Sequence, residues 1–401
     1  MKILVISNLY PPNLRGGAEQ IAYRITQELN KQGHKVTVFT TRPFEGIKSC
    51  KAEVGEKLVE PIYRMFPPNL YYLLNDNKIP VIARALWHLI DAYSPAPARE
   101  LKYIIKREKP DVILTHNLKG LGLQVVKEIK RSGVFHIHTV HDVQLSIPSG
   151  LLMAGQEKSF LNRSWFRKIY EKQIQKIFGS PDVVISPSQF LADFYRERNF
   201  FPNSRIEVLP NPLPDFDLVK KDNNIPNSPL RILFTGQLEK HKGTLWLLRL
   251  LDQIDVPFKL HIVGDGTLAD YVNDWTIRDT RVVYHGFVSL EYLMKLFSIC
   301  HVTVVPSFCY ENSPTIIYES FLAGVPVIAS NLGGIGELVK EAQNGYLFEA
   351  GNQEQFLAAI KKIVNNTDHL LDHQDKIREI VKDYSLENYT KQLRSFFPPL
   401  S

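Results

Sequence analysis

The first part of the chain alternates short apolar runs with an amphipathic stretch. Lys2–Ser7 is mostly branched and apolar, and residues typical of turns follow it as far as Gly17. Apolar side chains then recur at helical spacing up to Leu29, before a second apolar run at Val36–Phe39. Strand, glycine turn, helix and strand in this order predict a βαβ unit.

The alternation continues along the chain with two interruptions. Residues 41–110 are less regular and contain several prolines, so we interpret them as an insertion with helices near 80–92 and 97–108. A second break, rich in proline and polar residues, covers Val208–Asn227. The remaining strands are expected at Val112–Leu114, Phe135–Thr139, Val183–Ile185, Arg231–Phe234, Lys259–Val263, Val282–Tyr284, Val302–Val304, Val327–Ala329 and Gly345–Phe348.

Two successive alternations of this kind predict an α/β protein with two doubly wound, Rossmann-like domains, residues 1–210 and residues 211–385. Ligands of such sheets bind at the carboxyl ends of the strands. We therefore expect the two sheets to face one another across a cleft that holds the substrates.

Composition adds the size class and the expected compartment. The 401 residues, 44% of them hydrophobic and 22% charged, fit about two globular domains. The three cysteines are scattered and indicate neither a disulfide framework nor a zinc site. The apolar run after Met1 is too short for a signal peptide, and no stretch is typical of a membrane span, so we expect a cytoplasmic protein.

Charge is unevenly distributed along the chain. Residues 1–210 carry 30 Lys and Arg against 19 Asp and Glu, whereas the remaining residues carry 18 against 23. A basic N-terminal half indicates either an anionic partner or simply a solvated basic surface. Because basic and aromatic residues do not cluster into a stacking platform, nucleic acid is not the expected partner.

The most informative polar group is the segment from Glu311 to Glu319. It follows a predicted strand and leads into a helix that begins at about Thr315. The free N–H groups and positive dipole end of a helix N-terminus suit a phosphate or a sugar oxygen. The spacing of the two carboxylates alone is equally typical of ordinary surface residues.

A second group lies between Phe234 and Gly243, where a predicted strand ends in a glycine turn. Gly236 permits close approach of the backbone to a ligand, and Lys242 would bring a point charge to a diphosphate. Taken alone, Lys242 is also compatible with a solvated loop position.

Two smaller groups occur in the N-terminal half. Gly16 and Gly17 precede a helix and form either a phosphate-binding nest or a tight turn. His141 follows a predicted strand at its carboxyl end, where ligands bind. Since His136 and His138 point to the opposite face of that strand, no three-histidine metal site is expected.

Two glycine patterns carry less weight. Gly264, Gly266 and Ala269 match a dinucleotide-binding fingerprint, but they follow a middle strand, and Tyr284 stands where an acidic residue would bind a ribose. We therefore do not expect an NAD enzyme. A glycine run at residues 333–336 opens another helix and is a weak signal alone.

Together, these groups resemble the retaining, nucleotide-sugar-dependent glycosyltransferases of family 4, which have the GT-B fold. The matching motifs occur in the family's order along the whole chain: PPNLRGGAEQ (11–20), GHKVTV (33–38), KPDVILTHN (109–117), HTVHD (138–142), VISPSQF (184–190), VLPNPL (208–213), FTGQLEKHKG (234–243), IVGDGT (262–267), HGFVS (285–289), ENSPTIIYE (311–319) and GVPVIASNLGGIGE (324–337).

The resemblance implies a role for each group. Glu311 would contact the donor sugar, and Glu319 would hold the ribose hydroxyls. Lys242 would neutralise the diphosphate, and His141 would lie near the donor sugar at the reaction centre.

Further donor-binding positions also follow from the resemblance. They are the backbone of Asn312, Ser313 and Thr315 for sugar or phosphate, Gly16 and Gly17 for the diphosphate and acceptor, and Gly286, Phe287 and Val288 for the base. In such chains the C-terminal segment, here residues 386–401, packs back on the first domain.

Two positions depart from the family's pattern: Gly336 stands where a proline is usual, a smaller concern, and Gln237 matters more. Gln237 stands where an arginine usually helps to neutralise the phosphates, and an amide can donate hydrogen bonds but brings no charge. The expected reaction is transfer of a hexose, without metal or cofactor, from a UDP- or GDP-sugar to a saccharide or lipid-linked acceptor. A sugar-nucleotide epimerase and a non-catalytic donor-binding module stay as alternatives.

Residues 158–178 bear on the anionic partner. Lysines and arginines alternate there with large apolar residues, which is typical of a helix lying on a membrane surface. The same pattern fits an ordinary helix that packs its apolar stripe on the first sheet. The inner face of the membrane is therefore an alternative to a purely cytoplasmic location.

Overall fold

The computed structural model describes residues 1–55, 60–157, 159, 164–213, 229–365 and 374–399. The chain folds into two compact units. Unit 1 consists of Met1–Gly150, Arg163–Pro212 and Leu386–Ser401, and unit 2 consists of Leu151–Asn162 and Leu213–Ser385. Two segments of the chain thus belong to unit 2. The sequence-based prediction did not assign the shorter one, residues 151–162, to this unit. Residues 214–227 of the expected break lie outside the described residues.

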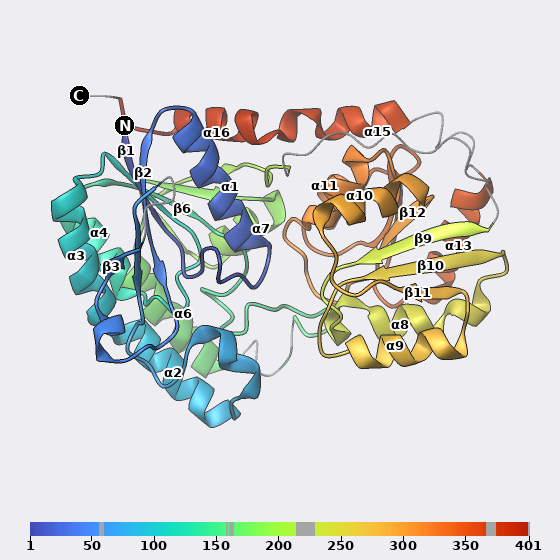
Figure 1. The fold of residues 1–401 in the computed structure, drawn as a ribbon, viewed down its shortest axis with the longest axis horizontal. Helices are drawn as coiled ribbons and strands as arrows, with labels where there is room; N and C mark the ends of the chain where they lie inside the picture. The colour runs from blue at the N-terminus through green and yellow to red at the C-terminus, as the bar shows by residue number, and fades with distance from the viewer. Residues whose placement is uncertain (56–59, 158, 160–163, 214–228, 366–373, 400–401) are drawn as a thin grey trace. The chain divides into compact units, whose positions relative to one another are not determined.

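Unit 1 is built on one eight-stranded sheet of order β3-β4-β2-β1-β5-β6-β7-β8, parallel except where β3 meets β4 (Figure 1). Its strands are β1 (Lys2–Ile6), β2 (Lys35–Thr41), β3 (Glu53–Val54), β4 (Ile62–Met65), β5 (Val112–Thr115), β6 (Phe135–Thr139), β7 (Val183–Ser186) and β8 (Arg205–Val208). Its helices are α1 (Gly17–Lys31), α2 (Val81–Tyr93), α3 (Ala96–Glu108), α4 (Gln124–Ser132), α6 (Trp165–Phe178), α7 (Gln189–Glu197) and α16 (Leu386–Ser395), with 3-10 turns at Ile47–Cys50 and Leu73–Lys78.

Both faces of this sheet are buried, as expected for parallel strands. Ile3 and Val5 share one hydrophobic cluster with residues of α1 and α16. Leu4 and Ile6 point to the opposite face and are fully buried there. α16 lies beside α1, where Gln32 donates a hydrogen bond of 2.7 Å from Nε2 to Thr390 Oγ1.

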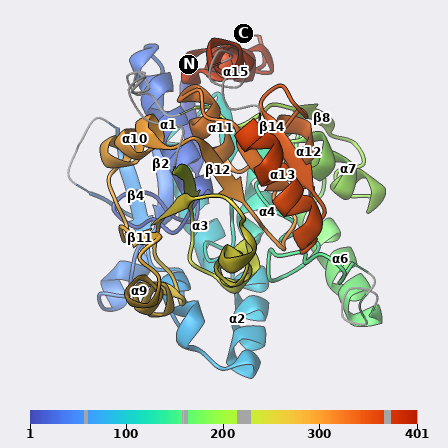
Figure 2. The same ribbon diagram turned by 90° about the vertical axis from the view of Figure 1, so that its right-hand side faces the viewer.

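Unit 2 has a six-stranded, all-parallel sheet of order β11-β10-β9-β12-β13-β14 (Figure 2). Its strands are β9 (Leu230–Thr235), β10 (Phe258–Val263), β11 (Val282–Tyr284), β12 (Val302–Val305), β13 (Val327–Ser330) and β14 (Gly345–Phe348). Its helices are α8 (Thr244–Arg249), α9 (Ala269–Arg278), α10 (Leu290–Ile299), α11 (Thr315–Leu322), α12 (Ile335–Leu338), α13 (Gln353–Asn365) and α15 (Gln374–Val381), with 3-10 turns at Lys240–Lys242, Leu251–Gln253 and Lys382–Tyr384.

In both sheets the winding direction reverses at one point. The strand order changes sense between β1 and β5 in unit 1 and between β9 and β12 in unit 2. In doubly wound sheets, the loops that leave the carboxyl ends of two such strands separate and open a crevice for ligands. The loops after these strands are therefore the expected ligand-binding loops.

All the predicted strands and the two helices of the insertion are confirmed. The structure differs at β3, β4 and β8, three strands that the sequence reading missed; β3 has only two residues. β4 has only four residues in a proline-rich region, and the exposed or half-buried side chains of β8 give it no apolar run. Residues 244–253, between β9 and β10, form α8 followed by a separate 3-10 turn. Among the described residues, no helix has the length and hydrophobicity to cross a bilayer.

The dinucleotide-like glycines of unit 2 are explained by packing of the backbone. Gly264 has φ of +135°, and a Cβ there would lie 1.8 Å from the carbonyl oxygen of Gly236. A Cβ on Gly266 would lie 2.7 Å from the carbonyl oxygen of Leu238. Both glycines thus let the loop after β10 pack against the loop after β9.

We expect Gly264→Ala to destabilise unit 2 by about 2–4 kcal/mol, because the added Cβ forces two backbone segments apart. Gly236→Ala is the matched control. Gly236 has φ of +148°, but a Cβ there would meet nothing within 4 Å. Urea unfolding of both variants measures the difference, and equal losses would show that backbone strain alone, without the close contact, governs this turn.

Candidate active site

Two of the three charged residues singled out in the second half of the sequence, Lys242 and Glu311, form an ion pair. Lys242 follows β9 and Glu311 follows β12, the two strands that flank the switch point of unit 2. Lys242 Nζ donates a hydrogen bond of 2.5 Å to Glu311 Oε1. The exposed fractions of the two side chains are 25% and 14%, so the pair is largely withdrawn from water.

Glu311 is fixed from several directions. Ser307 Oγ donates a hydrogen bond of 2.8 Å to Glu311 Oε1, and the Gly334 N–H donates one of 2.7 Å to the Glu311 carbonyl. Gly333 has φ of +63°, and a Cβ there would lie 2.2 Å from the same carbonyl oxygen. The glycine run at residues 333–336, a weak signal in the sequence, therefore leaves room for the Glu311 backbone to pack closely.

The pair determines the protonation of both groups. Burial disfavours the charged form of each, but the mutual attraction is stronger. The pKa of Glu311 falls below its ordinary value because the Lys242 ammonium and the hydrogen bonds from Lys242 and Ser307 outweigh burial. The pKa of Lys242 rises, since Glu311 overcomes the opposing effect of burial. Both groups are charged at neutral pH.

The loop after Glu311 leads into α11 as expected. Thr315 is the first residue of α11, and Ser313 Oγ lies 2.7 Å from Tyr318 Oη, which ties the loop to the helix. Glu319 is buried on the second turn of α11. Glu311 and Glu319 thus belong to one loop-helix segment at the carboxyl end of β12.

The remaining predicted positions of unit 2 lie on neighbouring loops. Gln237 is exposed in the turn after β9. Gly286 follows β11, and its carbonyl accepts a hydrogen bond of 2.8 Å from the Gly264 N–H. Phe287 is 85% exposed, and Val288 beside it is half-buried. A large aromatic ring open to solvent at a strand's carboxyl end is available for stacking on a planar ligand.

In unit 1, the predicted glycine nest is partly occupied by the protein itself. Gly16 and Gly17 are exposed at the start of α1, after β1. However, the buried Glu19 accepts a hydrogen bond of 2.9 Å from the Gly16 N–H. The Gly16 N–H therefore serves as part of a capping box of α1.

His141 is paired with a histidine that sequence reasoning missed. His116 follows β5, and its Nδ1 lies 3.0 Å from Nε2 of His141, with the rings stacked. Burial lowers the pKa of His141 to about 4 and holds that of His116 well below its ordinary value. Both imidazoles are neutral at physiological pH, so His141 offers hydrogen-bonding nitrogens and no positive charge.

The other two histidines of β6 are structural. Thr115 Oγ1 lies 2.8 Å from His136 Nε2 and 2.9 Å from His138 Nδ1, and all three side chains are buried. Their ring nitrogens thus bind a hydroxyl of the neighbouring strand.

A small polar cavity of about 40 Å³ adjoins His141 in unit 1. Asp142 and Asp91 line it, the latter from α2. Burial raises the pKa of Asp142 to about 6 and that of Asp91 to about 7. A cavity of this size holds a few water molecules or the hydroxyl groups of a ligand.

Comparison with known proteins matches both halves of the chain. The family described as Glycosyltransferase Family 4 matches residues 15–215, and Glycosyl transferases group 1 matches residues 215–383. This chain belongs to the family 4, group 1 glycosyltransferases. The fold is GT-B, with the two units as its two Rossmann-like domains.

Several relatives of this glycosyltransferase extend over most of its length. An uncharacterized 42.6 kDa protein in the cps region of Klebsiella pneumoniae is 27% identical over 358 residues, which are 87% of this chain and 90% of that protein. The putative teichuronic acid biosynthesis glycosyltransferase TuaC of Bacillus subtilis is 23% identical over 86% of this chain and 84% of its own. The solved structure of Anabaena Alr3699/HepE in complex with UDP has a TM-score of 0.70 at 19% identity, over 98% of this chain and 99% of that one.

One contact of the Glu311 loop was not predictable from local sequence. Residues 152–154 pair with it through one isolated antiparallel bridge: the Tyr310 N–H donates to the Leu152 carbonyl, and the Ala154 N–H to the Phe308 carbonyl, both at 2.8 Å. Tyr310 Oη also donates a hydrogen bond of 2.7 Å to Glu157. A short irregular segment with long-range partners has no periodicity by which it could be predicted.

We expect Lys242→Met to destabilise the folded glycosyltransferase by roughly 3–5 kcal/mol at neutral pH, because it leaves the Glu311 carboxylate buried without its cation. The double variant K242M/E311Q should regain most of this loss. Urea unfolding of the parent, the single and the double variant measures both effects.

The loss in Lys242→Met should also depend on pH. In the parent, the pKa of Glu311 is lower in the folded state than in the unfolded chain, where it is about 4.3. The contribution of Glu311 to folding stability is therefore present above that unfolded value and is lost as pH falls below it. Without Lys242, burial raises that pKa, and protonation then relieves the buried charge. The stability gap should narrow between about pH 7 and about pH 5, and a constant gap would contradict the pairing.

Proposed function

We propose that this glycosyltransferase moves a hexose, with retention of anomeric configuration, from a UDP- or GDP-sugar to a saccharide or lipid-linked acceptor in polysaccharide or glycolipid biosynthesis. The observation that carries the proposal is the buried Lys242–Glu311 pair at the switch point of unit 2. Two similar proteins support the proposal: TuaC is named for teichuronic acid biosynthesis, and the structure of Alr3699/HepE was solved in complex with UDP.

Unit 2 binds the donor in this proposal. The Lys242 ammonium, kept protonated by Glu311, neutralises charge that develops on the departing diphosphate. The N-terminus of α11, with the backbone of Asn312, Ser313 and Thr315, donates hydrogen bonds to the same phosphates or to the sugar. The ionised Glu311 accepts hydrogen bonds from sugar hydroxyls, and Glu319 accepts those of the ribose. Gly286, Phe287 and Val288 border the base.

The reaction exchanges one bond for another at the anomeric carbon. The bond from this carbon to the β-phosphate oxygen breaks, a bond to the acceptor oxygen forms on the same face, and the acceptor proton passes to the departing phosphate. His141, neutral at physiological pH, hydrogen-bonds to the donor sugar, and His116 orients its ring. Lys242 and the helix N-terminus carry out the charge stabilisation without a metal ion.

Two alternatives to this proposal differ from it in the need for an acceptor and in turnover. A sugar-nucleotide epimerase needs no acceptor, whereas the cavity beside His141 offers carboxylates to a second substrate. A non-catalytic donor-binding module would also use the Lys242 charge to bind a diphosphate, and Gln237 brings no charge where the family usually has an arginine, so turnover and not donor binding separates this module from a transferase. Among the described residues, Cys50, Cys300 and Cys309 form no disulfide, which favours a reducing, cytoplasmic setting.

We expect UDP or GDP to raise the melting temperature of the protein, because a ligand that binds the folded state stabilises it. The Lys242→Met variant should lose most of the affinity for the diphosphate while keeping the weaker affinity for the nucleoside, since only the diphosphate needs the ammonium. Thermal shift and titration calorimetry with UDP, GDP and the nucleosides measure this. A panel of nucleoside diphosphates that leaves the melting temperature unchanged would refute donor binding.

With the donor identified in this way, Glu311→Gln should lower turnover by about 10²–10³-fold per folded molecule, because an interaction with the reacting sugar is lost. Excess EDTA should leave turnover unchanged. Proton NMR of the product should show the anomeric configuration of the donor, and an inverted product would exclude retention. Interconversion of donors without any acceptor would instead establish the epimerase.

A further inference from the structure

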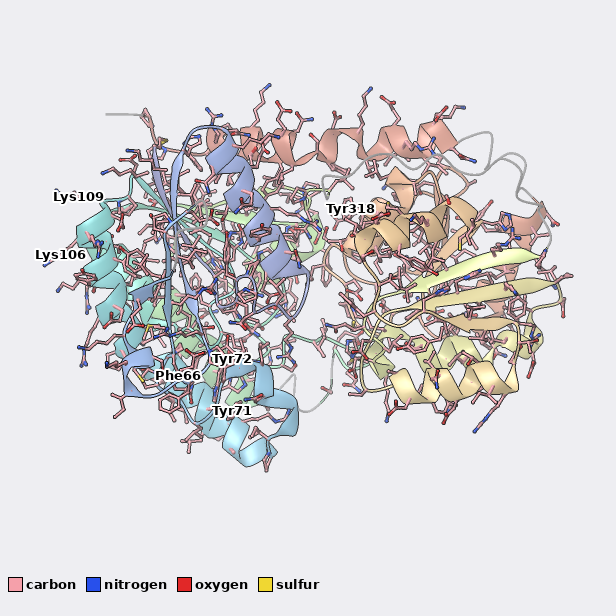
Figure 3. The ribbon with its side chains drawn as sticks, viewed as in Figure 1. Phe66, Tyr71, Tyr72, Lys106, Lys109 and Tyr318 are labelled. Carbon is pink, nitrogen blue, oxygen red and sulfur yellow. The ribbon has the colours of Figure 1, made fainter. Side chains whose placement is uncertain are left out.

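Helix α2 has an unusual exposed side. Its inner side is anchored by Trp87, which is buried, stacks on Tyr71 with ring centroids 5.6 Å apart and donates a hydrogen bond of 2.9 Å to the Tyr71 carbonyl (Figure 3). Its outer side should then be polar. Instead, Leu86, Leu89 and Tyr93 are exposed there, with Leu89 57% exposed.

Helix α6 presents a related surface. Ile174 and Ile177 are buried, so this helix does pack an apolar stripe inside unit 1, as one of the two sequence readings expected. Its opposite side nevertheless exposes Trp165 by 62% and Ile169 by 44%. The exposed lysines of α6 alternate with these two residues: Lys168, Lys172 and Lys176. Residues 158 and 160–163 of the stretch 158–178 lie outside the described residues.

The exposed sides of the two helices are joined. Tyr93 Oη of α2 donates a hydrogen bond of 3.2 Å to Gln173 Oε1 of α6, and Gln173 lies on the same helical stripe as Trp165 and Ile169. We call this surface the α2–α6 face. It consists of Leu86, Leu89, Tyr93, Trp165, Lys168, Ile169, Lys172, Gln173 and Lys176.

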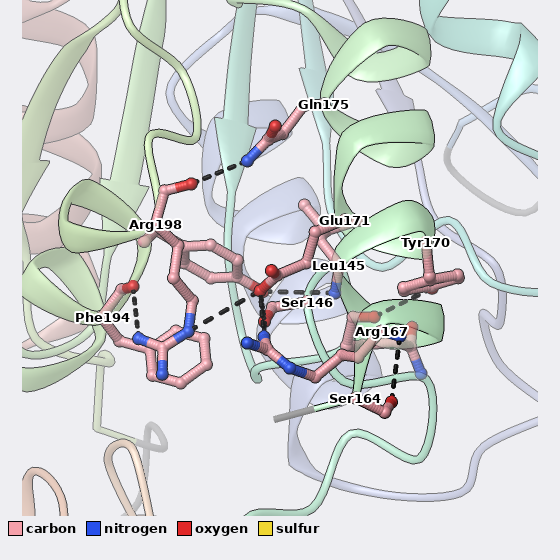
Figure 4. A network of polar contacts seen from close by, with 11 residues as sticks. Leu145, Ser146, Ser164, Arg167, Tyr170, Glu171, Gln175, Phe194 and Arg198 are labelled. Atoms are coloured by element: carbon pink, nitrogen blue, oxygen red, sulfur yellow. Dashed lines mark hydrogen bonds and ion pairs between the residues drawn. The ribbon is translucent and has the colours of Figure 1, made fainter. Parts of the chain in front are cut away.

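The α2–α6 face contains no exposed acid among the described residues of either helix. The acid of α6, Glu171, is buried and paired with Arg167, while Arg198 approaches to 3.8 Å and Ser146 donates a hydrogen bond to the same oxygen (Figure 4). The acid of α2, Asp91, is buried and accepts hydrogen bonds from the Gly120 N–H. The positive charge of the lysines on this face is therefore not compensated by an exposed acid among the described residues of either helix.

Large apolar side chains, a tryptophan and uncompensated lysines on one surface match an anionic bilayer surface. The apolar side chains enter the boundary between headgroups and acyl chains, and the lysines contact the phosphates. A soluble partner with an acidic groove or a second copy of the chain would be less suited, because the mixture of exposed tryptophan and lysine is that of an interfacial helix.

The position of the cavity makes this surface relevant to the reaction. The inner sides of the same two helices line the cavity that contains Asp91 and His141, with Tyr170 and Ile174 contributed by α6. A bilayer bound at the outer side would hold this cavity close to its headgroups. An acceptor sugar attached to a lipid could then reach the cavity while its lipid stays in the bilayer.

We propose that the α2–α6 face binds an anionic membrane surface and that the acceptor is a saccharide on a lipid carrier. The membrane part stands by itself, whereas the acceptor part rests on the proposed glycosyl transfer.

Co-sedimentation with vesicles tests the membrane part without any need for activity. The protein should bind vesicles of phosphatidylcholine with phosphatidylglycerol, bind pure phosphatidylcholine far more weakly, and dissociate as salt rises. The charge-reversal variant K168E/K172E should bind at least about tenfold more weakly. Its matched control is K106E/K109E, two exposed lysines at the end of α3, which should bind as the parent does (Figure 3).

The apolar contribution has its own pair of variants. Leu89→Ser on the α2–α6 face should weaken vesicle binding by about fivefold, because a side chain that enters the bilayer is lost. Ile277→Ser, on the 80% exposed Ile277 of α9 in unit 2, should leave it unchanged. Both should keep the parent's melting temperature and its affinity for UDP.

Three outcomes would overturn the membrane proposal. They are a parent protein that sediments with neither vesicle, equal binding of charged and neutral vesicles, and K168E/K172E binding like its control. A dimer in solution that Leu89→Ser dissociates would assign the face to a second copy instead. If vesicle binding fails while UDP still stabilises the protein, the proposed transferase function stands and only this inference falls.

The acceptor part is tested with the donor found by the nucleotide screen. Radiolabel from that donor should enter the lipid extract of membranes, and K168E/K172E should transfer less at unchanged affinity for UDP. Label that enters only water-soluble oligosaccharides, at the same rate in the parent and in K168E/K172E, would overturn it.

Discussion

The organisation of this glycosyltransferase depends on one buried ion pair at the point where the sheet of unit 2 reverses its winding. Lys242 and Glu311 are 69 residues apart in the chain, and adjacent parallel strands place their loops side by side. A buried pair of charges is costly unless geometry and further hydrogen bonds compensate. Ser307 and the close backbone packing at Gly333 supply that compensation, so the surrounding loops are shaped by the requirement to keep two charges together.

In unit 1, burial has the larger effect on the pKa values of the ionisable groups. Burial makes His116 and His141 neutral and raises the pKa values of Asp91 and Asp142 toward neutrality. One unit thus offers a paired charge, which suits a diphosphate, and the other offers neutral imidazoles and carboxyl groups that titrate close to neutral pH, which suit hydroxyls. This division of electrostatics agrees with a donor bound to unit 2 and an acceptor bound to unit 1.

Much of the fold was predictable because parallel strands buried on both faces leave continuous apolar runs, as at Lys2–Ile6 and Val302–Val305. Glycines with an unusual φ and charged residues at strand ends mark loops, so Lys242 and Glu311 could be singled out. Their mutual contact could not, because the distance between two loops depends on strand order. Two other features depend equally on tertiary neighbours that local sequence does not encode. They are the pairing of residues 152–154 with the Glu311 loop and the exposure of the leucines on the outer side of α2.

The most direct test of this account is a crystal structure of the protein with the nucleoside diphosphate sugar that binds it most tightly. The account requires Lys242 Nζ within hydrogen-bonding distance of a diphosphate oxygen and the Glu311 carboxylate in contact with the sugar. A diphosphate bound elsewhere, with the contact between Lys242 and Glu311 unaltered, would contradict it.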